Sequence, residues 1–249
     1  MDVILFGGQS NMRGTANSFP QDKIELNGVY EYFYNSKTYQ PLKHPCGEHI
    51  GEDLLHRASD GNGCILPDFC RAYQVIRPVK IMTAHVAKGG SMLCEWEKGS
   101  ERYEAAKEKM LEAIKAAKEI EEVEHIYYLW LQGESDAVYE TSEEEYFHRL
   151  VDYKNALKED LGIEKFGIIR VGYFSKEDEK FDHAIQNAQE RCVKEDKDFL
   201  MLTRVCEFLS KDQFFINPAH RGHYNNNALA IIGNCAGEYL SRYAVGEIK

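Results

Sequence analysis

Near its N-terminus the chain reads Val3-Ile4-Leu5-Phe6-Gly7-Gly8-Gln9-Ser10-Asn11-Met12. The four apolar residues predict a buried β-strand, and the two glycines allow the backbone to turn sharply where that strand ends. Ser10 is therefore placed at the carboxyl end of a strand, which is the edge where open α/β sheets bind ligands. Two interpretations follow: Ser10 is a nucleophile, or it is a polar loop residue that caps the next helix.

Strand and helix patterns alternate along the rest of the chain. Four further runs have the composition of strands, namely Lys80–Ala87, His125–Leu131, Phe166–Tyr173 and Phe199–Val205. Helical patterns lie between and after them, over Glu101–Glu122, from Ser142 to about Asp160, over Asp182–Asp196 and from about Tyr224 to Tyr243. This alternation predicts an α/β fold in which five parallel strands form a sheet covered by helices on both faces.

Residues 15 to 63 break this alternation. The segment is rich in Gly, Asn, His and Tyr and only weakly periodic, so we predict a long excursion over the edge that carries Ser10. It contains no repeat, low-complexity tract or plausible linker, and a length of 249 residues suits one large domain. We therefore expect residues 1–249 to form a single α/β domain.

Composition and charge narrow the possible partners and locations. The formal net charge is −11 and no cluster of Lys and Arg lies along a predicted face, which argues against nucleic acid and anionic membranes. The first strand begins at residue 2, and no run of about 18 apolar residues is present, so we expect a cytoplasmic protein unless a leader was removed. Seven scattered cysteines without a C-x-x-C pair predict reduced thiols, with neither a structural disulfide nor a zinc knuckle.

Two more segments bring glycine and polar residues to predicted strand ends. The second strand is followed by Lys88-Gly89-Gly90-Ser91-Met92, and the third ends in Gln132-Gly133-Glu134-Ser135-Asp136. Taken alone, the first is an ordinary strand-to-helix turn and the second a helix cap. Together with the turn that carries Ser10, however, they place glycine and polar residues at three consecutive strand ends. This joint occurrence favours a functional site at this edge of the sheet.

Three sequence pieces together carry a family resemblance. They are Gly8-Gln9-Ser10-Asn11-Met12, then Gly89-Gly90-Ser91 followed by Trp96, then Trp130-x-Gln132-Gly133-Glu134-x-Asp136. These pieces resemble the motifs of SGNH/GDSL-type hydrolases, and are most similar to the sialate O-acetylesterase and acetyl xylan esterase branch, carbohydrate esterase family 6. The resemblance covers nearly the whole chain. It implies a three-layer, flavodoxin-like α/β/α fold and a serine esterase that removes acetyl groups from carbohydrates.

The resemblance also implies a catalytic histidine near the C-terminus, and two histidines compete for that role. The family pattern places an Asp three residues before this histidine and a Gly about ten residues after it. Gly233 stands at the matching distance from His223, so we predict His223 rather than His220 as the base. The Asp position is occupied by His220, which cannot stabilise an imidazolium by charge as a carboxylate does.

Another group must then orient His223. The resemblance implies that certain members use the carboxylate of the Gln-Gly-Glu motif, so we predict Glu134 as the triad acid. Asp136 and Asp212 are poorer candidates, and a backbone carbonyl in this role would leave a working dyad. The spacing of His220 and His223 also suggests a metal pair, but a usable metal site needs at least a third ligand.

The expected mechanism is acyl transfer. His223 takes the proton of Ser10 during attack on the acetyl carbonyl and later activates water to release acetate. The predicted oxyanion donors are the backbone N–H groups of Ser10 and Gly90 and the side-chain amide of Gln132. The scheme requires no metal and no organic cofactor. Candidate substrate-binding residues are Gln9, Asn11, Trp96 and Asp136.

Two of these candidate residues could have a structural role instead, and two alternative functions remain open. Asn11 could instead brace the nucleophile loop, and core packing is the default for Trp96. A lipolytic or thioester hydrolase of the same superfamily needs an apolar acyl channel, whereas the polar excursion suits a small acyl group on a sialate or xylo-oligosaccharide. A decayed triad would leave a non-catalytic carbohydrate-binding protein. The negative net charge slightly disfavours binding of an anionic sugar, and a local positive charge from Arg13 or Arg221 would offset this effect.

Overall fold

The centre of the fold is a seven-stranded sheet with the strand order β3-β2-β4-β1-β5-β6-β7. The computed structural model describes residues 1–16, 26–58, 62–174, 178–220 and 222–249. The strands are β1 Asp2–Gly8, β2 Val29–Phe33, β3 Thr38–Pro41, β4 Ile81–Ala87, β5 His125–Leu131, β6 Lys165–Ile169 and β7 Phe199–Thr203. Every pairing is parallel except that of β2 with β3, so the carboxyl ends of the parallel strands meet at one edge.

The prediction of five strands is corrected to seven. The five predicted strands are present and adjacent, as β4-β1-β5-β6-β7, while β2 and β3 come from the excursion at residues 15 to 63. The sequence hides β2 because a carboxylate, Glu31, lies fully buried in its middle. β6 also ends earlier than predicted, at Ile169, because the N–H of Val171 donates to the side chain of Gln189 instead of a neighbouring strand.

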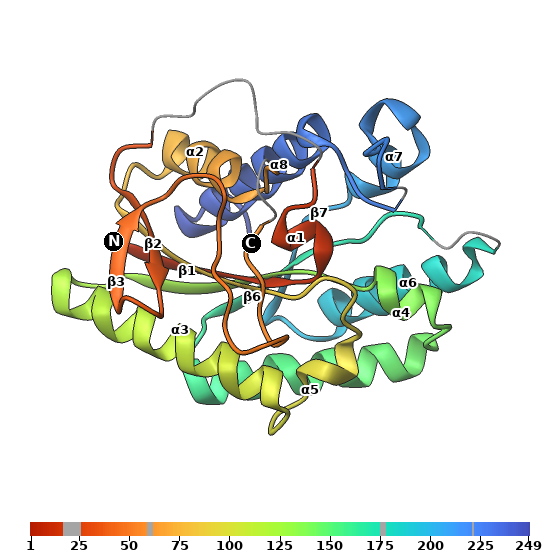
Figure 1. Ribbon diagram of the computed structural model, residues 1–249, viewed down its shortest axis with the longest axis horizontal. Coiled ribbons are helices and arrows are strands. Elements are labelled where there is room, and N and C mark those ends of the chain that lie inside the picture. The colour runs from red at the N-terminus through yellow and green to blue at the C-terminus, as the bar shows by residue number, and fades with distance from the viewer. Residues whose placement is uncertain (17–25, 59–61, 175–177, 221) are drawn as a thin grey trace.

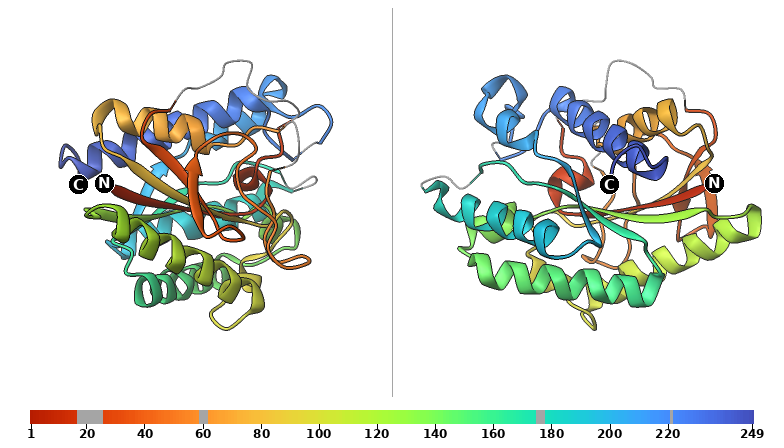
Figure 2. Two further views of the ribbon diagram at one scale, coloured as in Figure 1. Left: turned by 60° about the vertical axis from the view of Figure 1, so that its left-hand side comes forward. Right: turned by 180° about the vertical axis from the view of Figure 1, so that it is seen from behind.

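Helices cover both faces of the sheet, as predicted (Figures 1 and 2). α2 and α8 lie side by side on one face, and α3, α5 and α6 lie on the other. The helices are α1 Ser10–Arg13, α2 Leu66–Ile76, α3 Glu101–Ile120, α4 Glu134–Val138, α5 Glu143–Leu161, α6 Glu179–Glu195, α7 Cys206–Lys211 and α8 Asn226–Ala244, with 3-10 turns η1 Leu93–Trp96 and η2 Gln213–Phe215. None of the helices in these described ranges is both long and apolar enough to cross a membrane.

Local signals set several helix boundaries as expected. The hydroxyl of Ser142 accepts the N–H of Glu145 at the start of α5, and Gly162 ends that helix with a left-handed φ of 69°. Gly233 has a packing role: a Cβ there would lie 2.6 Å from the carbonyl oxygen of Ile65. The glycine therefore permits the close approach of α8 to the start of α2.

Candidate active site

The residues predicted at the strand ends converge on one cleft. Ser10, Gly90, Glu134 and His223 all line this cleft, which has a volume of about 630 Å³. They come from the turns after β1, β4 and β5 and from the segment before α8. His220 also lines it, so the structure brings both candidate bases to the same place.

The nucleophile turn is a tight backbone crossing. Gly8 has a φ of 152°, and a Cβ there would lie 2.1 Å from the carbonyl oxygen of Leu131. The next residue, Gln9, donates its N–H to that same carbonyl at 3.1 Å. Ser10 is consequently the first residue of α1 and makes no side-chain cap. The interpretation of Ser10 as a capping residue is therefore wrong, and its hydroxyl is available to the cleft.

Asn11 joins the nucleophile helix to two other parts of the site. Its Nδ2 donates to Oε1 of Glu134 at 2.7 Å, and its Oδ1 accepts the N–H of Tyr224 at 3.2 Å. Tyr224 directly follows His223 in the chain. Asn11 is itself fully buried, and its two hydrogen bonds brace the loop.

Glu134 is a buried carboxylate with one oxygen engaged. Burial raises the pKa of Glu134 to about 6, although the hydrogen bond from Asn11 acts in the opposite direction. Its Oε2 has no hydrogen-bond partner among the described residues. The carboxylate therefore retains an acceptor for a further donor inside the cleft.

His223 lies in a turn fixed by backbone hydrogen bonds. Its N–H donates to His220 and its carbonyl accepts from Asn217. The ring Nδ1 is buried and, within the described part of the chain, makes no hydrogen bond. Burial lowers the pKa of His223 below 6.5, and the nearby carbonyl of His220 partly offsets this effect. Asp212 is exposed and caps η2 through the N–H of Phe214, so it is not placed as a triad acid.

The prediction for Gln132 needs correction. Its side chain is completely buried, and its Nε2 donates to the carbonyl of Ser91 and to the carboxylate of Asp136. Its Oε1 accepts from the hydroxyl of Tyr146 on α5. Both amide hydrogens are therefore engaged away from the cleft, and Gln132 holds the turns after β4 and β5 together without facing an oxyanion.

Asp136 and Trp96, both named as candidate substrate-binding residues, lie in the interior, and for Trp96 this agrees with the default expectation of core packing. Asp136 is fully buried and accepts the N–H of Leu93 and the hydroxyl of Thr141. Trp96 is likewise fully buried, and its ring meets that of Trp130 edge-on at 5.4 Å. Neither residue belongs to the lining of the cleft.

Gln9 lines the cleft but also clamps the third motif. Its Oε1 accepts the N–H groups of Gly133 and Ser135, and its Nε2 donates to the hydroxyl of Ser135. Only 3% of the residue is exposed. The amide of Gln9 therefore positions the turn that carries Glu134, which is a structural role the sequence did not reveal.

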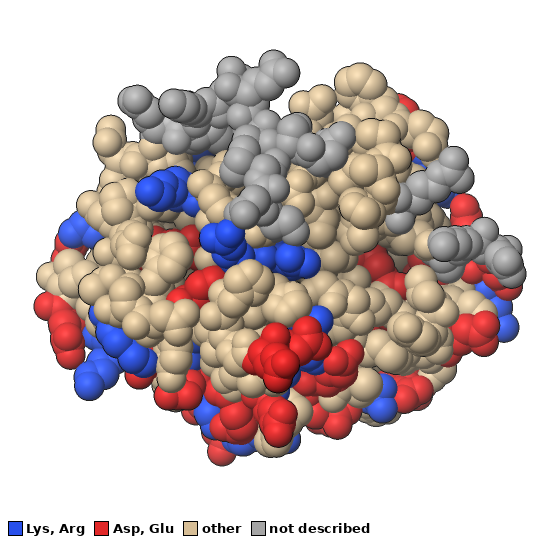
Figure 3. Space-filling view, in the orientation of Figure 1, with Lys and Arg blue, Asp and Glu red and all other residues tan. Residues whose placement is uncertain are grey.

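The cleft wall includes residues that sequence reasoning missed. Lys88 forms an ion pair with Asp53 at 2.7 Å, and His56 lies 3.2 Å from the same carboxylate. Lys88 and His56 line the cleft together with the two aromatic residues Tyr139 and Phe174. Figure 3 shows Lys and Arg side chains near the centre of one face, with acidic side chains gathered lower down. Arg13 lines the cleft as well, whereas Arg221 lies outside the described residues.

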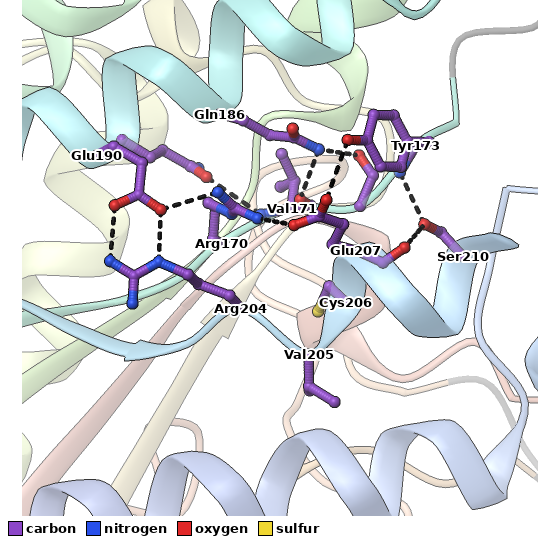
Figure 4. A network of polar contacts seen from close by, with 12 residues as sticks. Arg170, Val171, Tyr173, Gln186, Glu190, Arg204, Val205, Cys206, Glu207 and Ser210 are labelled. Carbon is purple, nitrogen blue, oxygen red and sulfur yellow. Dashed lines mark hydrogen bonds and ion pairs between the residues drawn. The ribbon is translucent and has the colours of Figure 1, made fainter.

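A polar network supports the far wall of the cleft (Figure 4). Arg170 forms ion pairs with Glu190 on α6 and Glu207 on α7, and thereby ties both helices to the end of β6. Ser210 on α7 accepts the N–H of Tyr173 at 3.0 Å. These contacts hold the segment that leads to Phe174, which lines the cleft.

Comparison with protein families identifies the chain. The model of the family described as "Carbohydrate esterase, sialic acid-specific acetylesterase" matches residues 1–233. The chain belongs to this family. A probable carbohydrate esterase from Arabidopsis thaliana is 34% identical over 185 residues, which are 70% of this chain and 69% of the relative. Membership of this carbohydrate esterase family supports an esterase activity.

Solved structures share the carbohydrate esterase fold. The crystal structure of the Arabidopsis protein aligns with a TM-score of 0.72 at 18% identity, covering 97% of this chain and 99% of that one. NanS aligns with a TM-score of 0.64 at 14% identity over 98% of both chains. A carbohydrate acetylesterase from Xanthomonas citri aligns with a TM-score of 0.60 at 15% identity, covering 98% of this chain and 57% of that one. At these identities the likeness concerns the fold alone.

Proposed function

We propose that the protein is a serine esterase that removes O-acetyl groups from carbohydrates. The observation that carries this proposal is the convergence of Ser10, Glu134 and His223 on one cleft in a carbohydrate esterase family member. The cleft also presents the backbone of Gly90, which has a φ of 75° and no atom within 4 Å of its Cβ position. A bound acetyl group therefore has a nucleophile, a base and backbone donors around it.

The reaction would proceed in two acyl-transfer steps. His223 takes the proton of the Ser10 hydroxyl as its oxygen attacks the acetyl carbonyl, then gives that proton to the departing sugar hydroxyl. Water, deprotonated by His223, hydrolyses the acetyl-serine and releases acetate. We assign stabilisation of the oxyanion to the backbone N–H groups of Ser10 and Gly90, because the side-chain amide of Gln132 donates to Ser91 and Asp136.

Glu134 is the proposed acid of the triad. Its free Oε2 and the unbonded Nδ1 of His223 belong to the same cleft, and catalytic hydrogen bonds often tighten only when substrate binds. An ionised Glu134 would accept the Nδ1–H and stabilise the imidazolium that forms during each step. If Glu134 played no such part, the carbonyl of His220 would be the group that orients a Ser–His dyad.

The lining of the cleft favours a small acyl group on a polar alcohol over a lipid. Lys88, His56 and Asn62 place polar groups around it, while the aromatic side chains of Tyr139 and Phe174 offer flat apolar surface. Sugars commonly stack on such rings through their C–H faces, whereas a long acyl chain requires an apolar channel. These residues support the acetylesterase over the lipolytic alternative.

The test combines covalent labelling with product release. Wild-type protein is treated with a fluorophosphonate probe, and the labelled peptide is located by mass spectrometry. Acetate release is measured on O-acetylated sialic acid, acetylated xylo-oligosaccharides and a long-chain acyl ester. Labelling at Ser10 together with acetate release from a sugar supports the proposal. Absence of both contradicts it and favours a carbohydrate-binding protein, while preference for the long-chain ester favours a lipase.

Glu134→Gln should lower activity and raise stability. We expect kcat to fall by about 10²- to 10⁴-fold, because the neutral amide cannot stabilise the imidazolium. Folding raises the pKa of the Glu134 carboxyl group from 4.5 to about 6, so the folded state favours the protonated form. The stability that this group contributes is fully present below pH 4.5 and is lost as the pH rises through about 6. At pH 8 the variant should therefore unfold with a free energy higher by roughly 2 kcal/mol, measured by urea titration.

The pH profile and a surface variant complete this test. In wild type, kcat/KM should fall as the pH drops through about 6, since protonation removes both the Glu134 carboxylate and the neutral His223. Glu140→Gln, at an exposed position after the same helix, should change neither activity nor stability appreciably. Unchanged kcat in Glu134→Gln would assign the orienting role to the carbonyl of His220.

Tyr139→Ala should weaken sugar binding selectively. The ring of Tyr139 is 68% exposed and lines the cleft, so we expect KM for an acetylated oligosaccharide to rise by about 3- to 10-fold. Hydrolysis of a small phenyl acetate should change little, because that substrate does not extend to the rim. Phe208→Ala removes an aromatic ring of similar exposure outside the cleft lining and serves as the control. Equal KM shifts in both variants would contradict the assignment.

A further inference from the structure

A second cluster of reactive side chains lies outside the cleft lining. His44, Cys46 and Cys64 each place one potential ligand atom within 4.8 Å of the other two. The two cysteines are buried, with exposed fractions of 0% and 2%. Cys64 Sγ and His44 Nδ1 are 3.9 Å apart. The mechanism proposed above uses none of these residues.

The spacing of these atoms fits a tetrahedral metal ion. Around zinc, with bonds of about 2.3 Å to sulfur and about 2.0 Å to nitrogen, neighbouring ligand atoms lie roughly 3.5–3.8 Å apart. The three atoms need to contract only slightly to reach that geometry. Two sulfurs and one imidazole nitrogen form a donor set that favours zinc, whereas calcium and magnesium favour oxygen ligands.

A buried carboxylate stands beside the cluster. Glu31 is fully buried, and its Oε1 accepts the N–H of Gly47, the residue that follows Cys46. Its Oε2 has no hydrogen-bond partner within the described ranges. The ammonium of Lys109 on α3 compensates part of the cost of burying this carboxylate, because it lowers the pKa of Glu31. Glu31 does not belong to the group whose ligand atoms all lie within 4.8 Å of one another, so the three-residue cluster alone forms the candidate site.

We propose that His44, Cys46 and Cys64 bind a structural zinc ion. Binding replaces the proton of each thiol by a bond to zinc, so two protons pass to solvent for each ion bound and no electron is transferred. The neutral imidazole donates its nitrogen lone pair. The two cysteines are buried and the cluster lies outside the cleft lining, so the ion would have a structural role, with a water molecule in the fourth position.

The position of the cluster explains what such an ion would stabilise. A Cβ on Gly14, the residue after α1, would lie 2.9 Å from the Cβ of Cys64. On the other side, a Cβ on Gly47 would lie 2.4 Å from Nδ1 of His85, whose Nε2 lies 3.0 Å from the carbonyl oxygen of Met12. Both sides of the cluster thus pack around α1. Zinc would fasten residues 44–46 to Cys64, in the part of the chain that packs against α1.

Cobalt substitution tests the site directly. Wild-type protein is purified with reductant, stripped with a chelator and titrated with Co²⁺. We expect a thiolate-to-cobalt charge-transfer band and intense tetrahedral d–d bands that saturate at one cobalt per chain and disappear when zinc is added. Cys46→Ala and Cys64→Ala should each lose these bands. Cys192→Ala, which removes a buried thiol from α6, should retain them. The same spectrum in both ligand variants, or none in wild type, overturns the proposal.

A second measurement needs no variant and therefore covers the case in which a ligand substitution prevents folding. One equivalent of zinc should raise the unfolding temperature of the reduced, chelator-stripped wild-type protein. An unchanged unfolding temperature would overturn the site. The seven cysteines are free thiols in the structure, so two fewer free thiols in denatured protein without reductant, with peptide mapping that joins Cys46 to Cys64, would instead reveal a disulfide. That result also overturns the metal proposal.

Discussion

Ser10→Ala should lower kcat for acetyl-ester hydrolysis by about 10⁴-fold or more, while the protein remains folded. The loss is large because no acetyl-enzyme can form, and the remaining groups stabilise only an uncatalysed attack by water. Stability should change by less than about 1 kcal/mol, since the Ser10 hydroxyl makes no hydrogen bond within the described residues and caps no helix. Steady-state kinetics and circular dichroism of the purified variant measure the two quantities.

A neighbouring serine provides the matched control. Ser135 lines the same cleft, but its hydroxyl accepts a hydrogen bond from the amide of Gln9. Ser135→Ala should therefore cost about tenfold at most, through a loosened turn, and should still be labelled by a fluorophosphonate at Ser10. Substantial activity in Ser10→Ala, or an equal loss in Ser135→Ala, would show that the nucleophile is not Ser10.

The fold was predictable where burial follows a local pattern. The five central strands are short apolar runs, and β-α-β connections place them in parallel. The pair β2 and β3 was missed because its stability depends on partners distant in sequence. Glu31 in β2 accepts the N–H of Gly47, and the nearby ammonium of Lys109 on α3 lowers its pKa against the effect of burial. No local rule reveals that a charged residue in the middle of a strand is neutralised in this way.

The convergence of the site was predictable for a topological reason. Parallel strands bring their carboxyl ends to one edge, so Ser10, Gly90 and Glu134 meet although they lie far apart in sequence. The direction of individual side chains was not predictable. Gln132 turns inward because Tyr146 on α5 supplies a hydroxyl for its Oε1. Whether a polar residue at a strand end faces the cleft or the interior depends on such contacts with later helices.

The cysteine cluster illustrates the same limit for metal sites. His44 and Cys46 are separated by one residue, whereas Cys64 lies eighteen residues further along the chain. Zinc sites recognised from sequence have two ligands in a short, regular spacing followed by a second such pair. Here the path of the excursion brings Cys64 back to the other two residues. Spacing alone therefore does not reveal that these three potential ligand atoms lie within 4.8 Å of one another.

His223→Ala should be nearly as damaging as loss of the nucleophile, with kcat lower by about 10⁴-fold. His223 is half-buried in a turn that is bonded to Asn217 and followed by Tyr224, which Asn11 holds. Its ring is therefore positioned in relation to the nucleophile helix itself. Burial lowers the pKa of His223, which keeps the imidazole neutral near pH 7 and able to accept a proton. Steady-state kinetics on an acetyl ester measure the loss.

His220→Ala is the matched control for His223→Ala, because both variants lose one imidazole ring. His220 is exposed and lies with its ring centre 6.2 Å from that of His223, so each substitution removes one imidazole from the same wall. We expect the His220 variant to retain activity within about tenfold, with a small upward shift of the acid limb of the pH profile, because the electrostatic effect of the His220 ring lowers the pKa of His223. The reverse ranking would make His220 the base. It would also remove the reason for assigning Glu134 as its acid, since Asn11 links Glu134 to the segment that begins directly after His223.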